Sequence, residues 1–333
     1  MRIAIEVTQA LARRVPTNLQ KNQLAQLPAD FLSMPTTREP WTDEEIVARI
    51  GNCPRLASLS SINSALKELI SAEDSVTSQI SEIIRRDPSL TARLLRLVNS
   101  VFFGLSRKVT NIEEAVFYLG LRQIRELTLA TPVIEELNNL NKKYGNVQWD
   151  HLWQHSIGTA ILTREILALT NTPFEDDTDY IMGLVHNVGK IVMAYVFPEE
   201  FSELVRFEAE SPIAFCRRER ELLGGWDHAM IGAHYLEKHN LSEEVVETVR
   251  YHNTPSRAPN YAKNAAAVHI ADVLLRASGI PDIEKTGTIP ESKWTRLAAW
   301  RILFGTDNSE ARLSIASLKH TLNRMPQMLK EMV

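Results

Sequence analysis

The chain has 333 residues and a formal net charge of −4, from 37 basic and 41 acidic residues. Hydrophobic residues make up 44% of the sequence and charged residues 23%, which supports a buried core and excludes intrinsic disorder as the main state. The slightly acidic balance argues against a generally basic nucleic-acid-binding protein.

The cysteine count and the hydropathy pattern bear on the compartment. Two cysteines, Cys53 and Cys216, are too few for a disulfide framework or a thiolate metal site. No apolar run approaches the roughly 18 residues of a membrane span. The first residues also lack the apolar core of a signal peptide. We therefore expect a cytoplasmic protein that does not associate with a membrane.

Helical periodicity runs through nearly the whole chain, and only 13 glycines and 15 prolines interrupt it. Residues 1–42 contain four prolines and predict a short helix followed by an extended arm. Helices are then predicted around 66–70, 80–84, 88–98 and 112–119, with a long one after Gly120. Beyond a polar stretch at 138–148, helices are predicted near 150–170, 179–196, 198–206, 211–222, 228–238, 242–252 and 262–278. A linker at 279–292 precedes two terminal helices, so the predicted fold is all-α.

The usual phosphate-cradling loops G-x-x-x-x-G-K-[ST] and G-x-G-x-x-G are absent, as are C-x-x-C and H-E-x-x-H. Five candidate metal ligands instead lie on or beside five different predicted helices. They are His155, His186, His228, His252 and Asp272. Imidazoles and a carboxylate that converge from separate helices can build a metal site in a helical bundle. The alternative for each histidine is a structural, hydrogen-bonded side chain.

Longer segments carry a more specific signal. In chain order they are DPSLTARLL (87–95), LVNSVFFG (97–104), EEAVFYLGLRQIRELTLA (113–130), HLWQHSIGTA (151–160), GLVHNVGKIVM (183–193), ELLGGWDHAMIGAHYL (221–236) and VRYHNTP (249–255). Together they closely resemble the HDOD family, the HD-related output domain of bacterial signalling proteins, over about residues 48–278.

The resemblance implies an all-α HDOD helical bundle with a defined domain organisation. An N-terminal helical subdomain at 48–140 is expected to pack on an HD-like helical subdomain at 146–278. Residues 1–47 then form an N-terminal arm with a short helix, and residues 279–333 form a linker and C-terminal helices. The arm and the C-terminal helices are expected to pack back onto this body.

The family is similar to the HD phosphohydrolases, in which histidines and aspartates hold one or two metal ions that activate water. The resemblance matches His155 to the first histidine and His186 to the histidine of the His-Asp pair. His228 matches the next histidine, and His252 matches the first of a later His-His pair. Asp272 matches the distal aspartate.

Two departures from this pattern decide the functional interpretation. Asn187 stands where the His-Asp pair has its carboxylate, and Asn253 stands where the family commonly has a second histidine. An amide is neutral and bridges metal ions poorly. The sequence therefore predicts no catalytic metal pair and no required cofactor. The alternative is a single divalent ion (Mn, Fe, Zn or Mg) held by His155, His186 and Asp272.

Residues 85–125 carry eight basic and three acidic side chains in a chain that is acidic overall. Arg122 and Arg125 in this stretch, and Lys190 after Gly189, are candidate contacts for a phosphate-bearing ligand such as a nucleotide. The alternative is a solvated helix surface whose arginine stems cover the core.

The leading functional interpretation is a non-catalytic signalling or regulatory protein that binds a partner protein. A wider form of this interpretation adds the binding of a small ligand. The competing interpretation is a metal-dependent phosphohydrolase acting on a nucleotide or a cyclic dinucleotide. Asn187 separates the two, because the enzyme needs a carboxylate at that position. A nucleic-acid-binding regulator has only the arginine-rich stretch in its favour.

Overall fold

The computed structural model divides the chain into two compact units, Met1–Pro40 and Trp41–Val333. It describes residues 41–53, 81, 84–85, 88–99, 105–120, 124, 147–170, 178–305 and 308–331, all in the second unit. The arm and short helix expected within 1–42 lie outside the described residues, apart from 41 and 42. The helices expected around 66–70 and after Gly120 also lie outside them, apart from residue 124.

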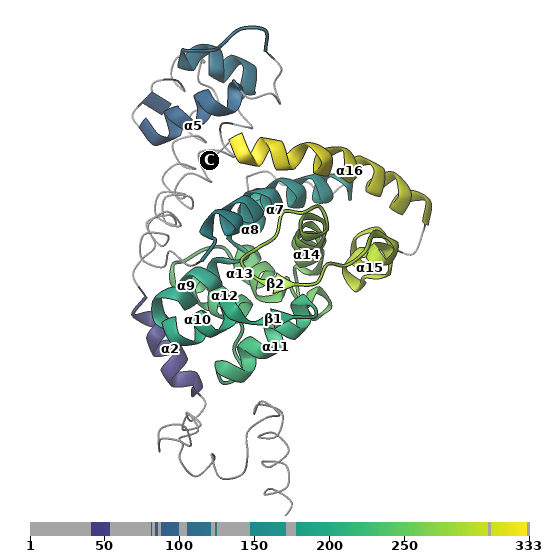
Figure 1. The fold of residues 1–333 in the computed structure, drawn as a ribbon. Helices are drawn as coiled ribbons and strands as arrows, with labels where there is room; N and C mark the ends of the chain where they lie inside the picture. The colour runs from purple at the N-terminus through teal and green to yellow at the C-terminus, as the bar shows by residue number, and fades with distance from the viewer. Residues whose placement is uncertain are drawn as a thin grey trace, which may run out of the picture. The chain divides into compact units, whose positions relative to one another are not determined.

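The described residues are mainly helical, which confirms the all-α prediction (Figure 1). The α-helices are α2 (Asp43–Gly51), α5 (Pro88–Val98), α7 (Trp149–Leu169), α8 (Thr178–Val185), α9 (Val188–Val196), α10 (Pro198–Arg206), α11 (Pro212–Leu222), α12 (His228–Lys238), α13 (Glu243–Tyr251), α14 (Ala262–Ala277), α15 (Ala298–Phe304) and α16 (Asn308–Glu331). Residues 112–120 are helical as well. The remaining elements are β1 (Glu208–Ala209), β2 (Lys285–Thr286) and two 3-10 turns, η3 (Pro255–Arg257) and η4 (Glu291–Arg296). The two strands form one parallel pair.

Three sequence expectations differ from the structure. The helix predicted at 179–196 is two helices, α8 and α9, separated by a turn at residues 186 and 187. The boundary placed between residues 47 and 48 falls inside α2, which begins at Asp43 because Thr42 and Glu45 form a capping box. The segment 279–292, expected as a linker, contributes strand β2 and the start of η4.

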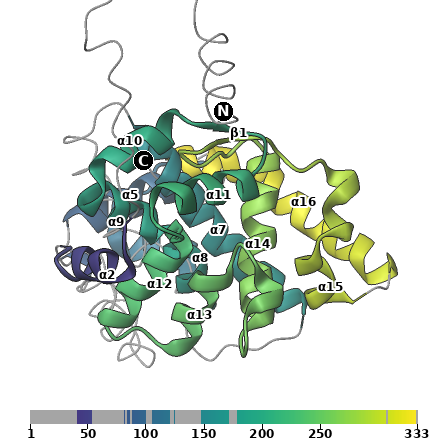
Figure 2. The same cartoon turned by 90° about the horizontal axis from the view of Figure 1, so that it is seen from below.

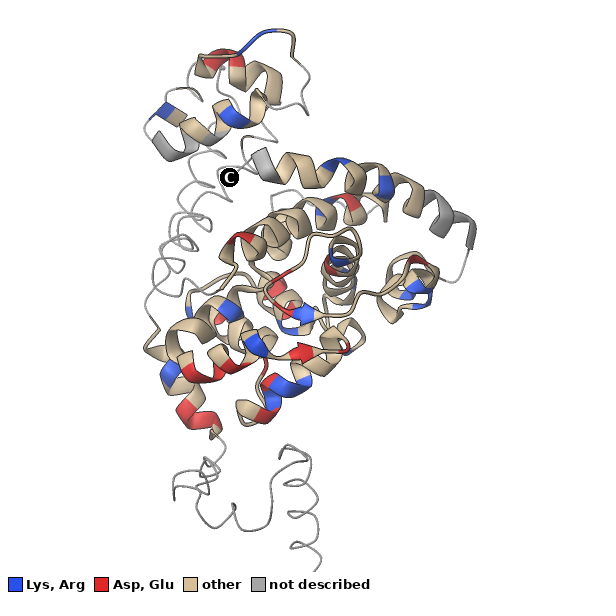
Figure 3. Cartoon of the chain, in the orientation of Figure 1, with Lys and Arg blue, Asp and Glu red and all other residues tan. Residues whose placement is uncertain are grey.

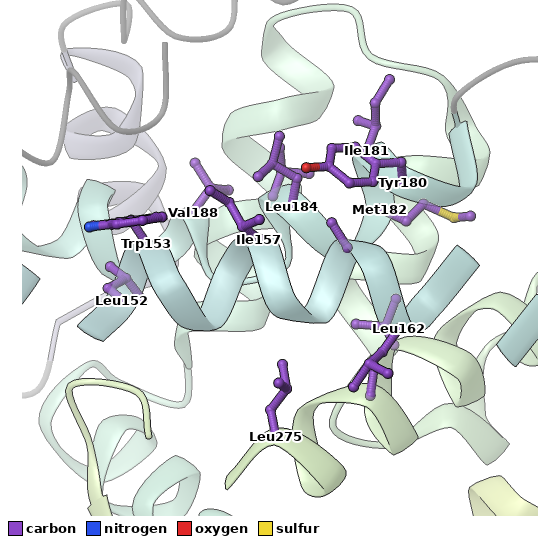
Figure 4. Close-up of a cluster of buried hydrophobic side chains, with 14 of the residues drawn as sticks. Leu152, Trp153, Ile157, Leu162, Tyr180, Ile181, Met182, Leu184, Val188 and Leu275 are labelled. Atoms are coloured by element: carbon purple, nitrogen blue, oxygen red, sulfur yellow. The ribbon is translucent and has the colours of Figure 1, made fainter. Parts of the chain in front are cut away.

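Helix α7 is the centre of the described core. It packs against α8, α14 and α16, and fourteen of its 21 residues are buried. Figure 4 shows Trp153 and Ile157 of α7 facing a layer that includes Leu184 of α8, with Leu275 of α14 on the other side. A helix that is apolar around most of its circumference is stable only where neighbours cover every face. The expected packing of the C-terminal helices onto the body is seen for α16 on α7 and for α15 on α14 (Figure 2).

No helix in the described part of the chain combines the length and the hydropathy needed to cross a membrane.

Glycines let two pairs of helices, α9 with α12 and α8 with α7, approach closely beside the histidines. A Cβ atom on Gly189 of α9 would lie 1.8 Å from the carbonyl oxygen of His228, at the start of α12. Gly232 faces it, because a Cβ there would lie 2.9 Å from the backbone nitrogen of Gly189. A Cβ on Gly183 of α8 would lie 2.5 Å from the Cα of Ala160 in α7. These contacts are with backbone, so a larger residue cannot be accommodated by a change of rotamer.

The substitution Gly189→Ala should lower the free energy of unfolding by about 3 kcal/mol, because α9 and α12 must move apart to admit the methyl group. The matched control is Gly51→Ala in α2, where the new Cβ would meet the mobile end of Lys238 at 3.3 Å. There the change should be neutral or stabilising by up to about 1 kcal/mol, since alanine favours a helix. Urea unfolding of both variants makes the comparison, and equal stabilities would contradict the close crossing.

Candidate functional site

The structure brings the five predicted ligands together from five elements. His155 lies on α7, His186 in the turn between α8 and α9, His228 at the start of α12, His252 at the end of α13 and Asp272 on α14. None is more than 4% exposed. Because α8 ends before His186 and α9 begins after Asn187, these two residues lie in a turn inside the bundle. A continuous helix, as expected from the sequence, would not have placed them in a turn.

The four histidines form a row of neighbouring rings. The ring centroids of His155 and His186 are 5.6 Å apart, those of His186 and His252 are 5.3 Å apart, and those of His252 and His228 are 5.4 Å apart. Four imidazoles in contact inside a helical bundle are far from the ordinary distribution of histidine, which is usually at least partly exposed.

In every ring of this row, Nδ1 is held by an acceptor on the outer side. Nδ1 of His155 donates to the carbonyl of Ile280 at 3.0 Å, that of His186 to Gly183 at 2.7 Å, and that of His252 to Val249 at 2.7 Å. Nδ1 of His228 faces both carboxylate oxygens of Glu219 at 2.9 and 2.7 Å. A carbonyl oxygen can only accept, so these contacts fix the ring orientations. Anchoring of one nitrogen by a carbonyl or carboxylate is typical of metal-binding histidines.

The inner nitrogens of His186 and His252 carry lone pairs. Burial, together with the neighbouring His252 and His155, lowers the pKa of His186 well below 6.5. Its Nε2 has no hydrogen-bond partner. Burial and the nearby His228 lower the pKa of His252 to about 3. Both rings are therefore neutral at physiological pH, and Nε2 of His186 is available as an acceptor or a ligand, whereas Nε2 of His252 has the Asn253 amide nitrogen 3.0 Å away.

His228 differs from these two because of Glu219. Burial opposes protonation of His228, but the Glu219 carboxylate outweighs it and raises the pKa of His228. Nε2 of His228 lies 3.4 Å from Nε2 of His252. Glu219 was not identified from the sequence, where it appears as one charge in the run RRERE.

Asp272 is the carboxylate of the row. Nε2 of His155 lies 2.6 Å from its Oδ1, and Nε of Arg276 donates to the same oxygen at 2.9 Å. Burial opposes ionisation of Asp272, but Arg276 and the hydrogen bond from His155 outweigh it and hold its pKa well below the usual range. His269, one turn earlier on α14, bonds instead to the backbone carbonyl of His252 at 2.9 Å. The structure thus places Asp272, and not His269, beside His155.

Both asparagines at the departures have polar side-chain contacts, although Oδ1 of Asn187 is buried without a hydrogen-bond partner. The Asn187 amide nitrogen donates to Oδ2 of Asp282 at 2.7 Å, and Asn187 itself is 2% exposed. The Asn253 amide nitrogen lies 3.0 Å from Nε2 of His252 and 3.2 Å from Nε2 of His228. Asn253 therefore interacts with the imidazoles as a neighbour and supplies no imidazole of its own.

A buried ion cluster lies next to the histidine row, and most of it was missed from the sequence. Lys190 pairs with Asp282 and Glu284, and Arg276 contacts the same two carboxylates at 3.3 and 3.1 Å. Asp282 and Glu284 belong to the segment expected as a linker. Asp282 and Glu284 are separated by one residue, so their side chains lie on the same face of an extended segment. This spacing is the one signal in the sequence that the segment faces inward. Arg276 follows Asp272 by four residues, a spacing that places both on one helix face.

The sequence suggested that the side chain of Lys190 faces a ligand or the solvent, and the structure corrects this. It is 2% exposed. Burial opposes its charge, but Asp282 and Glu284 outweigh burial and raise its pKa above the usual value. Burial likewise opposes ionisation of Asp282, while Lys190 and Arg276 lower its pKa. Lys190 is thus charged and fully engaged with acidic groups of this chain.

The basic stretch at 85–125 is only partly described. Arg122 and Arg125 lie outside the described residues. Arg85 pairs with Glu113, and Arg107 pairs with Glu114 at 2.5 Å. Part of the excess charge predicted there is therefore neutralised locally.

The donor set suits one metal ion better than two. Donor atoms of His155, His186 and Asp272 lie within 4.8 Å of one another, and His186 offers an unpartnered nitrogen. A second group with donors at this spacing consists of Cys216, Glu219 and His228. Two metal ions bridged by a carboxylate do not fit, because the side chain at position 187 is an amide and donates to Asp282.

The substitution Lys190→Met should lower the free energy of unfolding by about 3–5 kcal/mol, because it leaves two buried carboxylates without their main cation. The control is Lys285→Met, which removes an exposed pair with Glu208 at 3.7 Å and should cost about 0–1 kcal/mol. Chemical denaturation measures both. If the two losses are alike, the buried ion cluster does not stabilise the fold as described.

Comparison with solved structures identifies proteins that share this fold. An HDOD domain protein of Geobacter sulfurreducens is 21% identical, with a TM-score of 0.67 over 87% of this chain and 99% of that chain. A protein of Shewanella amazonensis named as a candidate phosphohydrolase is 24% identical, with a TM-score of 0.59 over 86% and 98% of the two chains.

Comparison of sequences identifies the family. An uncharacterized protein of Treponema pallidum (strain Nichols) is 29% identical over 187 residues. The match takes in 55% of this chain and 35% of that protein, so it spans about a third of the relative's length. The HDOD domain model matches residues 56–255, more than half of the chain. The chain therefore belongs to the HDOD family.

Proposed function

We propose that this chain is a non-catalytic regulatory protein of bacterial signal transduction that acts in the cytoplasm by binding a partner protein. The histidine row and Asp272 are, in this proposal, a retained scaffold of the HD phosphohydrolase type, with a structural role or a role in binding a small ligand such as a nucleotide. Membership of the HDOD family supports the regulatory class.

The observation that carries the proposal is the hydrogen bond from the Asn187 amide to Asp282. Hydrolysis by a metal pair needs an anionic oxygen at position 187, held between two ions. The amide is neutral, and its donor end is turned to a neighbouring carboxylate. A carboxylate there would lie against Asp282.

The charges around the row also disfavour a metal pair. Asp272 is already paired with Arg276, and Asp282 and Glu284 are paired with Lys190 and Arg276. A divalent ion entering this region would meet two fixed cations whose carboxylate partners are occupied. Coulomb repulsion between buried charges is weakly screened, so the arrangement opposes tight metal binding.

The described surface suits contact with a protein more than contact with a nucleic-acid backbone. Acidic and basic residues are interspersed over α10 and α11 (Figure 3). The groove there has Arg206, Arg217 and Arg218 beside Glu203 and Glu221. A phosphate backbone is recognised by a surface of one sign, whereas mixed charge is ordinary at protein contacts.

A second candidate function is a metal-dependent phosphohydrolase acting on a nucleotide or cyclic dinucleotide. It is favoured by the unpartnered Nε2 of His186 and by its closeness to His155 and Asp272. One divalent ion held by these three groups would polarise a phosphoryl oxygen and lower the pKa of a bound water. This candidate requires bound metal and measurable turnover, whereas the first candidate requires neither.

The two candidates are separated by metal analysis and a phosphodiesterase assay on protein purified without a histidine tag. We expect less than about half an equivalent of tightly bound metal, because the site lacks the bridging carboxylate. We also expect no turnover of bis(p-nitrophenyl) phosphate or a cyclic dinucleotide with added Mn²⁺. Stoichiometric iron, manganese or zinc together with turnover that His186→Ala abolishes would establish the enzyme.

The substitution Asn187→Asp should lower the free energy of unfolding by about 1–3 kcal/mol without metal, because it places a second buried carboxylate beside Asp282. Mn²⁺ should recover this loss, since an anionic ligand strengthens metal binding to the folded state. Thermal melting with and without Mn²⁺ measures both effects.

The matched control is Asn264→Asp on α14, where the amide donates to Glu244 at 2.6 Å. That change also creates a pair of carboxylates, but away from the histidine row, so Mn²⁺ should not recover the loss. A shift of the wild type by Mn²⁺ as large as that of Asn187→Asp would mean that Asn187 is not what disables the site.

A further inference from the structure

Residues 279–287, which we call the strap, join α14 to the segment before η4. The strap begins at Gly279, whose φ of +79° favours glycine. Along it the side chains alternate: Pro281 and Lys285 are exposed, whereas Asp282 and Glu284 are 3% and 6% exposed. The inward face of this extended segment therefore carries two carboxylates beside the apolar side chain of Ile280, which is 5% exposed.

The strap is attached by ion pairs and hydrogen bonds, and also by Ile280 and Ile283, which contact the apolar core. Asp282 and Glu284 each pair with both Lys190 and Arg276. The carbonyl of Ile280 accepts the hydrogen bond from His155, and Asp282 accepts the one from Asn187. The backbone pairing between β1 and β2 extends over two residues of each strand.

The other elements around the histidine row are attached differently. They are the helices α7, α8, α9, α12, α13 and α14, which pack on one another through a shared apolar core. Separating such helices exposes apolar surface at about 25 cal/mol per Å². Detaching the strap instead returns two carboxylates, a lysine and an arginine to water, and their hydration offsets most of the lost ion-pair energy. Release of the strap would also expose Ile280 and Ile283, but no helix would have to leave the shared core.

The closed strap also keeps the row from solvent. His155 and His186 are fully buried, and His228 and His252 are 2% exposed. A groove of about 700 Å³ lies against the strap, lined by Pro281–Thr286 together with Gln148 and His151 of α7 and residues of the α10–β1 region. The strap is therefore the wall between an open groove and the ion cluster beside the histidines.

We propose that the strap is a releasable closure, which opens by breaking the ion pairs of Asp282 and Glu284 with Lys190 and Arg276 and so exposes the histidine row from the groove side. This deepens the proposed function, since a row that binds a small ligand must first become accessible. Opening exchanges internal ion pairs for hydration and needs no unfolding of the helices.

Hydrogen exchange with mass spectrometry tests the opening on the full chain. In the wild type, amides of the strap should exchange at least about tenfold faster than those of α14, through an opening that depends little on denaturant. The substitution Glu284→Gln should accelerate strap exchange about tenfold further and leave α14 unchanged. The control Lys285→Gln, on the exposed side of the same segment, should leave both unchanged. Strap exchange that occurs only with global unfolding would overturn the proposal.

A disulfide lock provides the second measurement and does not weaken the fold. Ala209 and Thr286 are paired in register across the two strands, so Ala209→Cys with Thr286→Cys allows a cross-link. Modification of His186 by diethyl pyrocarbonate, read by peptide mass, should slow about tenfold or more in the oxidised form. It should return to the wild-type rate on reduction.

An unchanged rate in the locked form would show that His186 is not reached through the strap, and would overturn the closure. Neither measurement involves metal, turnover or a partner protein. Failure of the closure and failure of the proposed function are therefore told apart.

Discussion

The polar interior beside the histidine row depends on one buried carboxylate, Asp282. Its oxygen accepts from the amide of Asn187, pairs with Lys190 and lies 3.3 Å from Arg276. A buried charge without partners costs several kcal/mol, so none of these groups is tolerable alone in this position. Because Lys190 lies on α9, Arg276 on α14 and Asp282 on the strap, their mutual dependence fixes three segments that are distant in sequence.

The same network reaches the histidine row through Arg276. Arg276 pairs with Asp272, and Asp272 bonds to His155. From there the rings of His186, His252 and His228 follow in contact, each with its outer nitrogen anchored. The row has the orientation of metal-binding imidazoles, while fixed cations of the chain neutralise the carboxylates beside it. In the proposed function, this combination keeps the imidazoles in place without a carboxylate that is free to bridge a metal pair.

Apolar packing and the polar network have different tasks in this bundle. The helices around α7 are held by a dry core, and the close crossing of α9 and α12 relies on Gly189 facing Gly232. That crossing brings His186 and His228 into one row. The polar network then selects a single arrangement of the strap over the row. Hydrophobic burial is not directional, so it supplies stability, whereas the ion pairs and hydrogen bonds supply the geometry.

Local patterns in the sequence predicted most of what is local in the structure. Periodicity placed the helices now seen as α7 and α10–α14 within one or two residues, and the quoted segments identified the HDOD family, because both signals reside in contiguous residues. The candidates His155, His186, His228, His252 and Asp272 were named in advance. Tertiary structure alone decided the break between α8 and α9, the burial of Lys190, and the roles of Glu219, Asp282 and Glu284. These depend on which charges meet across long stretches of chain, and in a single sequence a buried carboxylate reads the same as a solvated one.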